Sequence, residues 1–214
     1  MDHKIIPIIS QLSTQTGDRT EASNRKVAGM CLENPDLVDE IADGLKSCDA
    51  GILGDCAEVM TLVAQVEPDL VAPYAKLLPP LLNHKKARVR WEAMHALGLI
   101  AHIVPKEIGK ILPRIDELIH SDSSVIVRDW AVQTVGNYAG TGKKAAGKAY
   151  PILIKSIPVR EFRHAHHALK GLKEVARLIP ESRVELEKIG MEFMESKRGV
   201  LKKAAKELLS IFNS

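Results

Sequence analysis

The 214-residue sequence predicts an all-α fold, a right-handed α-solenoid of about six antiparallel helix pairs. Three observations lead to this prediction. Apolar residues recur at helical spacing in the stretch 105–139, degraded copies of that stretch precede and follow it, and no long run has the alternating pattern of a strand. One helix pair cannot bury its apolar stripes alone, whereas stacked pairs can, so the repeats are expected to pack in a row.

The stretch 105–139 is predicted to form two helices joined by a polar turn. Pro105 suits the first position of a helix, where its missing N–H would have no partner anyway. Pro113 lies inside the apolar face of this helix and predicts a kink. The turn 121–124 follows, and either Ser123 or Ser124 can cap the second helix.

The same features recur along the chain at a period in the high thirties. The motif Lys-apolar-apolar-Pro occurs at 4–7, 76–79, 110–113 and 148–151, so the prolines step by 72, 34 and 38 residues. Val89-Arg90 in one second helix matches Val127-Arg128 in the next at an offset of 38. The second helices also share a column of small residues: Ala57, Ala93, Ala131, Ala168 and Ala205.

These residues resemble the HEAT repeats of the armadillo-like superfamily. The family pattern has a proline in the first helix, an Asp in the turn and a Val-Arg pair opening the second helix, and Pro113, Asp122 and Val127-Arg128 match it. Pro79 and Val89-Arg90 match in part, with His84 at the Asp position, while Gly54, Ala165 and Lys202 stand in the Arg column. The resemblance implies that first helices form a convex layer, second helices a concave layer, and Asp–Arg pairs link neighbouring repeats. It implies little about function, because this fold hosts many unrelated roles.

The expected helix pairs fill one continuous domain, 1–214. They are 3–13 with 20–33, 35–46 with 50–66, 68–83 with 86–103, 105–120 with 123–139, 144–155 with 160–178, and 181–195 with 198–212. Residues 14–18 are predicted to be a polar turn. Pro73 predicts that the helix after Pro68 is broken or begins late.

Composition narrows the class of protein. The odd number of cysteines, Cys31, Cys48 and Cys56, indicates reduced core thiols in a cytosolic protein, with a redox role as the alternative. The start of the chain has too few apolar residues for a signal peptide, and no stretch approaches the roughly 20 apolar residues of a membrane span. A cytoplasmic protein without a membrane partner is therefore expected.

Charge is distributed unevenly. Residues 1–84 carry 6 Lys/Arg and 13 Asp/Glu, a net charge of −7, whereas residues 143–214 carry 16 and 8, a net charge of +8. The turns inside successive pairs are expected to align on one edge, where their cations would form a basic ridge for an acidic partner; the alternative is an ordinary solvated surface. The candidate ridge residues are Lys85, Lys86, Arg88, Arg90, Arg128, Arg160, Arg163, Lys197, Arg198, Lys202 and Lys203.

Two motifs could bind a cofactor but have more ordinary interpretations. His164 and His167, with His166 between them, have a spacing that can chelate zinc, yet no third ligand or carboxylate is obvious, so packing is favoured. The stretch 140–144 hints at a phosphate loop. However, Asn137 stands where a glycine is needed and Lys144 where Ser or Thr must bind magnesium, so an ordinary turn is predicted. No metal and no cofactor are expected.

The leading functional hypothesis is a non-enzymatic scaffold that binds a protein or acidic peptide. No catalytic arrangement stands out, so no catalytic residue is assigned. The alternative is a nucleic-acid-binding protein using the basic ridge. Trp91, Asp129 and Trp130 suggest a special case, because HEAT-like DNA alkylation repair glycosylases bind DNA with tryptophans and an Asp, although those proteins are richer in aromatics. The oligomeric state is left open.

Overall fold

The computed structural model describes residues 7–212, so Lys4–Ile6 of the first motif copy lie outside the described residues. The chain forms two compact units, Met1–Ile103 and Val104–Ser214. Each unit is a set of stacked helix pairs, and no strand occurs among the described residues. The fold is therefore the predicted all-α solenoid of helix pairs; its organisation as one continuous domain stays a prediction.

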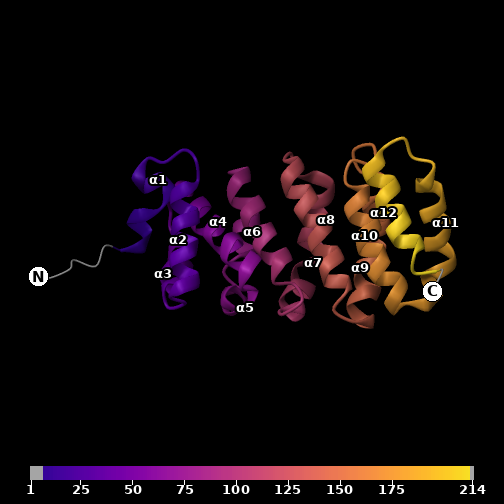
Figure 1. The fold of residues 1–214 in the computed structure, drawn as a ribbon, viewed down its shortest axis with the longest axis horizontal. Helices are drawn as coiled ribbons and strands as arrows, with labels where there is room; N and C mark the ends of the chain where they lie inside the picture. The colour runs from indigo at the N-terminus through magenta and orange to yellow at the C-terminus, as the bar shows by residue number, and fades with distance from the viewer. Residues whose placement is uncertain (1–6, 213–214) are drawn as a thin grey trace, which may run out of the picture. The chain divides into compact units, whose positions relative to one another are not determined.

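The first unit contains three helix pairs (Figure 1). The 3₁₀ helix η1 (Ile8–Gln11) and the one-turn helix α1 (Ser13–Thr16) pair with α2 (Ala22–Glu33), and α3 (Leu37–Gly44) pairs with α4 (Ala50–Val66). The third pair joins α5 (Pro68–Val71), η2 (Ala72–Tyr74) and η3 (Pro79–Asn83) to α6 (Ala87–Leu99). The turn predicted at 14–18 is shorter than expected, because residues 14–16 belong to α1 and the turn begins only at Gly17 (φ 73°).

The broken first helix of the third pair was predicted correctly. Pro73, Pro79 and Pro80 cannot donate backbone hydrogen bonds, and each ring clashes with the preceding turn. The segment 68–83 accordingly divides into one α turn and two 3₁₀ turns. The apolar residues of this segment are therefore divided among three short turns and do not form one straight stripe.

The second unit contains the other three pairs. They are α7 (Pro105–Ser121) with α8 (Val125–Ala139), α9 (Lys143–Ser156) with α10 (Ala165–Leu178), and η4 (Pro180–Ser182) and α11 (Arg183–Met194) with α12 (Gly199–Leu209). Helix α10 packs against both α8 and α12, so the second helices form one layer (Figure 1). The start of α10 was predicted at 160 but lies at Ala165, because Arg160, Glu161 and Phe162 have positive φ and cannot join a right-handed helix.

Small residues allow the second helices to approach closely. The five alanines of the predicted column, Ala57, Ala93, Ala131, Ala168 and Ala205, are all fully buried. Between α8 and α10 the contact is closer still. A Cβ atom added to Gly171 would lie 2.7 Å from Gly136 Cα, so the two backbones touch. The alanine column was thus a correct guide to where helices meet.

The cysteines only partly follow the sequence prediction. Cys31 and Cys56 are buried, and burial raises the pKa of Cys31 to about 11 and that of Cys56 to about 12, so both stay protonated core thiols. Cys48 is exposed in the turn before α4, so the prediction of a core thiol was wrong there. No helix within residues 7–212 has the length and apolar character needed to cross a bilayer.

Candidate functional site

Arg88 in the first unit belongs to a buried ionic network. Its guanidinium lies 2.8 Å from Asp55 Oδ1 and 2.5 Å from Glu58 Oε2, and both carboxylates are almost completely buried. Asn24 Nδ2 donates to both carboxylates, at 3.0 and 2.9 Å, and the backbone and hydroxyl of Thr14 donate to Asp55 at 2.8 and 2.6 Å. The network therefore ties together the second helices of three successive pairs.

The two carboxylates respond differently to this environment. Burial opposes ionisation of Asp55, but hydrogen bonds from Thr14, Asn24 and Arg88 outweigh it and lower the pKa. Burial raises the pKa of Glu58, and the bonds from Asn24 and Arg88 offset this only in part. The arrangement holds α2, α4 and α6 in register, and it leaves the Arg88 charge largely neutralised.

The other ridge cations of the first unit are Lys85 and Lys86, in the turn before α6, and Arg90, in the first turn of α6. Arg90 donates from Nη1 to the carbonyl oxygens of His84, at 2.8 Å, and Lys85, at 3.2 Å. These bonds brace the turn. Lys85 and Lys86 are exposed.

Arg128 in the second unit is also buried, with 4% of its surface exposed. Its Nη1 donates to the backbone carbonyl of Asp122, and its Nε donates to His164 Nε2 at 3.2 Å. His164 Nδ1 lies 2.5 Å from Asp129 Oδ1. Because Nε2 accepts from Arg128, Nδ1 carries a proton and donates to Asp129. Arg128 thus reaches the next pair through His164.

The turn before α10 presents Arg160 and Arg163 to solvent in a strained backbone. Arg160, Glu161 and Phe162 have φ of 49°, 57° and 62°, a left-handed turn without a glycine. Arg198 of the following pair donates to the Phe162 carbonyl at 3.0 Å, and the Phe162 ring packs edge-on against Phe193 at 5.8 Å between centroids. Strain of this kind persists only where neighbouring structure enforces it, and it is concentrated at functional sites.

We call Arg160, Arg163 and Arg198 the arginine cluster. They surround an open depression of about 490 Å³ that Asp129, Glu161 and His166 also line. A second depression of about 380 Å³ lies against Arg128, Arg160 and Arg163. None of the three cluster guanidiniums forms an ion pair with a carboxylate of residues 7–212, although Arg198 Nη1 donates to the Phe162 carbonyl. The donor groups of Arg160 and Arg163 are therefore available to a ligand.

The three histidines do not gather ligands for a metal. His166 and His167 stack at 3.9 Å between ring centroids, and His167 Nε2 lies 3.8 Å from Asp129. Burial lowers the pKa of both rings, that of His167 to about 4, so both are neutral at pH 7. Within the described part of the chain, no group of three or more His, Cys, Asp or Glu side chains could hold a metal ion.

The remaining sequence-predicted residues are placed as follows. Lys197, Lys202 and Lys203 are exposed in the turn before α12 and on α12 itself. Trp91 and Trp130, considered for DNA binding, are both partly buried. The basic ridge as a partner-binding surface stays a prediction. Sequence reasoning missed the Asp55–Glu58–Arg88 network and the Arg128–His164–Asp129 chain.

No family model matches the sequence, and no curated protein matches it. Solved structures do match. A designed armadillo repeat protein in complex with the peptide (KR)4 is 16% identical, with 96% of this chain and 98% of that chain covered and a TM-score of 0.75. The chain has an armadillo-like fold. Armadillo repeat proteins computationally designed for modular peptide recognition match at 17% identity, 95% and 97% coverage and a TM-score of 0.69. An engineered protein matches at 16% identity and a TM-score of 0.71, and this chain spans 58% of its length. At these identities the armadillo-like likeness concerns the fold alone.

Proposed function

We propose that the chain is a non-enzymatic scaffold that holds an acidic segment of a protein or peptide at the arginine cluster of its second unit. The observation that carries the proposal is the set of three guanidiniums that form no ion pair within residues 7–212 and surround one depression, which Asp129 and Glu161 also line. A guanidinium presents two parallel N–H groups that match a carboxylate, so such a cluster suits Asp and Glu side chains.

The surrounding charge supports an acidic partner. Residues 143–214 carry a net charge of +8, and Lys170, Lys202, Lys203 and Lys206 are exposed on α10 and α12. The designed armadillo repeat protein with the same fold is in complex with (KR)4, a basic peptide. The exposed charge of the second unit is positive, so it repels a basic peptide and attracts an acidic one.

An acidic peptide is favoured over nucleic acid for one reason. Proteins that bind single strands stack bases on exposed aromatic rings. Phe162 is 45% exposed, but its ring packs against Phe193, and both tryptophans are partly buried. A phosphate backbone would have only the cationic groups to contact.

The test is a titration of a fluorescent octapeptide of alternating Asp and Glu, followed by anisotropy at low and high salt. The double variant Arg160→Gln/Arg163→Gln removes two guanidiniums, and each lost charge-assisted bond is worth about 1.5–3 kcal/mol, so affinity should fall at least about tenfold. The matched control is Lys155→Gln/Lys188→Gln, which removes the same charge from exposed positions on α9 and α11. It should leave affinity within about twofold.

Three further results bear on the proposal. The peptide (KR)4 should not bind. Absence of binding by the acidic peptide at low salt, or equal weakening in the two double variants, would contradict the arginine cluster as the site. Tighter binding of DNA or RNA, with affinity falling steeply as salt rises, would replace the peptide with nucleic acid.

A further inference from the structure

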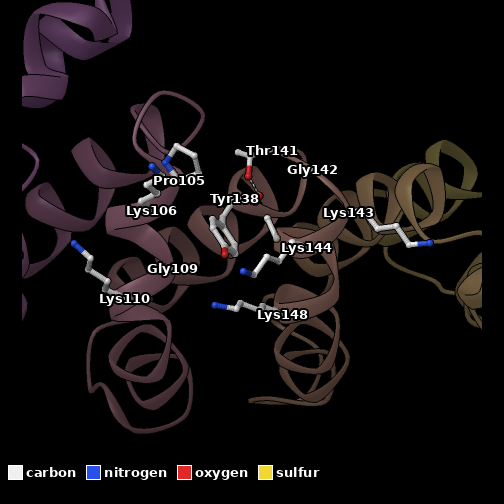
Figure 2. Close-up of a pocket in the computed structure, with 11 residues that line it drawn as sticks. Pro105, Lys106, Gly109, Lys110, Tyr138, Thr141, Gly142, Lys143, Lys144 and Lys148 are labelled. Carbon is white, nitrogen blue, oxygen red and sulfur yellow. Dashed lines mark hydrogen bonds between the residues drawn. The ribbon is translucent and has the colours of Figure 1, made fainter.

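A second basic surface lies in the same unit, away from the arginine cluster. It is an open pocket of about 630 Å³ formed by the first turns of α7, the end of α8, the turn at Thr141 and Gly142, and the first turns of α9 (Figure 2). This volume falls within the roughly 300–1,000 Å³ of small-molecule sites. Five lysines line the pocket, and no acidic residue does: Lys106, Lys110, Lys143, Lys144 and Lys148.

The lysines divide into two groups. Lys110 pairs with Glu107 at 2.8 Å and Lys143 with Glu181 at 3.3 Å, and in Figure 2 both side chains point away from the pocket centre. Lys144 and Lys148 point toward the Tyr138 hydroxyl in the same view. Neither of them, nor Lys106, forms an ion pair within residues 7–212. The pocket therefore gathers positive charge that the described chain does not neutralise.

Tyr138 places its hydroxyl in the pocket (Figure 2). The residue is 5% exposed, and its Oη makes no hydrogen bond to any described residue. A phenol hydroxyl in this position can donate a hydrogen bond to a ligand in the pocket. Gly109 makes room for it, since a Cβ at that position would lie 3.0 Å from Oη. Burial raises the pKa of Tyr138, which keeps the phenol protonated and able to donate.

The N-terminus of α9 points its unpaired amides at the same space. Gly142 caps the helix without a side-chain hydrogen bond, and the first intrahelical bond runs from Ala146 N to Gly142 O at 2.9 Å. The N–H groups of residues 143–145 thus have no intrahelical acceptor. The first turn of a helix favours acidic side chains, yet this one begins Lys143-Lys144. Two lysines at the positive end of a helix dipole are unfavourable alone, and a bound anion would offset that repulsion.

We propose that this pocket binds a compact, multiply charged phosphate, either a free oligophosphate or the phosphorylated headgroup of a larger molecule. Lysine ammonium groups act as point charges that suit phosphate oxygens, and the Tyr138 hydroxyl and the α9 amides supply further donors. No carboxylate lines the pocket to hold a magnesium ion. Tyr138 is the only aromatic lining residue and is buried, so no ring is exposed to stack on a base. Both facts favour a metal-free phosphate without a nucleobase.

The test is isothermal titration of the full chain with sodium tripolyphosphate at about 50 and 200 mM salt. Lys144→Gln/Lys148→Gln should weaken binding at least about tenfold. The matched control is Lys155→Gln/Lys188→Gln, which removes the same charge from exposed positions on α9 and α11 and should change affinity by less than about twofold. Tyr138→Phe should weaken binding by about threefold or more without lowering the melting temperature, because it deletes only a hydroxyl that no residue satisfies.

Further measurements distinguish a lipid headgroup from a free phosphate, and several results would overturn the proposal. Flotation with phosphatidylcholine vesicles containing a phosphoinositide, competed by tripolyphosphate, would identify a lipid headgroup as the source; tripolyphosphate binding without flotation would identify a free phosphate. No heat of binding at the lower salt, equal weakening in the two lysine variants, or unchanged affinity in Tyr138→Phe would overturn the proposal. So would binding of short duplex DNA without binding of tripolyphosphate.

Discussion

Arg128→Ala is expected to be among the most destabilising single changes of a charged residue in the second unit. Arg128 donates to two buried acceptors, the Asp122 carbonyl and His164 Nε2, and the alanine variant leaves both without their donor. Each such loss costs about 1–3 kcal/mol. Part of this is offset, because burial lowers the pKa of Arg128 and so opposes its charge, and nearby Arg160 adds to that effect. The net loss in the free energy of unfolding is therefore about 2–4 kcal/mol.

The comparison is with Arg114→Ala on the first helix of the same pair. Arg114 pairs with Glu117 at 2.6 Å, and these side chains are 31% and 60% exposed, respectively. A solvent-exposed pair of this spacing contributes about 0–1 kcal/mol. Arg128→Met serves as a second control, because it keeps most of the side-chain stem but donates to neither acceptor.

Urea unfolding followed by circular dichroism at 222 nm measures all three variants. Arg128→Ala should lose about 2–4 kcal/mol, Arg128→Met nearly as much, and Arg114→Ala less than about 1 kcal/mol. Equal losses for Arg128→Ala and Arg114→Ala would refute the reasoning from burial. Full stability of Arg128→Met would show that packing of the stem, rather than the hydrogen bonds, stabilises the turn.

Three other changes test the packing and the titration of the second unit. Ala131→Leu should cost about 1–3 kcal/mol in urea melts, because Ala131 is fully buried where second helices meet; an unchanged midpoint would place it elsewhere. Gly171→Ala should destabilise, since its Cβ would meet the Gly136 backbone, whereas Gly147→Ala in an open helical position should stabilise by about 0.5–1 kcal/mol. Burial lowers the pKa of His167 to about 4, so between pH 6.5 and 4 the unfolded state binds more protons and stability falls with falling pH. Melts of His167→Gln should show a weaker pH dependence across that window, and an identical slope would contradict this.

The helix pairs and their order could be predicted from the sequence because stacking imposes a period on the residues. Each helix pair must bury apolar side chains against its neighbours. This requirement repeats the apolar faces, the alanine column and the turn after Ser121 along the chain. Pro73 indicated the broken helix because proline removes a backbone hydrogen bond and clashes with the preceding turn wherever it occurs inside a helix. The start of α10 could not be predicted in this way, because nothing in Arg160-Glu161-Phe162 resembles the glycines and asparagines that usually accept positive φ.

The contacts of individual cations were harder to predict than the helices. Arg88 carries the buried ion pairs of the first unit, although the repeat pattern drew attention to Arg90, two residues later. The signal was the pair Asp55 and Glu58, which stand three residues apart in the most apolar helix and need a partner there.

The lysine pocket also left a signal in the sequence. Lys106 and Lys110 recur as Lys144 and Lys148 at the same offset of 38 that relates the helix pairs. Equivalent positions on stacked first helices lie side by side, so the repeat alone places these four lysines near one another. Only the structure shows the Tyr138 hydroxyl between them.

The contact between Gly136 and Gly171 helps to set the crossing angle of α8 and α10. It brings α8 and α10 together at one point, and the bond from Arg128 to His164 joins α8 to the start of α10 at a second point. Eight residues of helix separate Arg128 from Gly136, a lever of about 12 Å. A rotation of roughly 5° about the glycine contact would move the far end by about 1 Å, enough to break a hydrogen bond of 3.2 Å. The two attachments therefore fix the crossing angle of α8 and α10 as well as their separation. A side chain added at Gly136 or Gly171 would change that angle and so weaken the bond from Arg128 to His164.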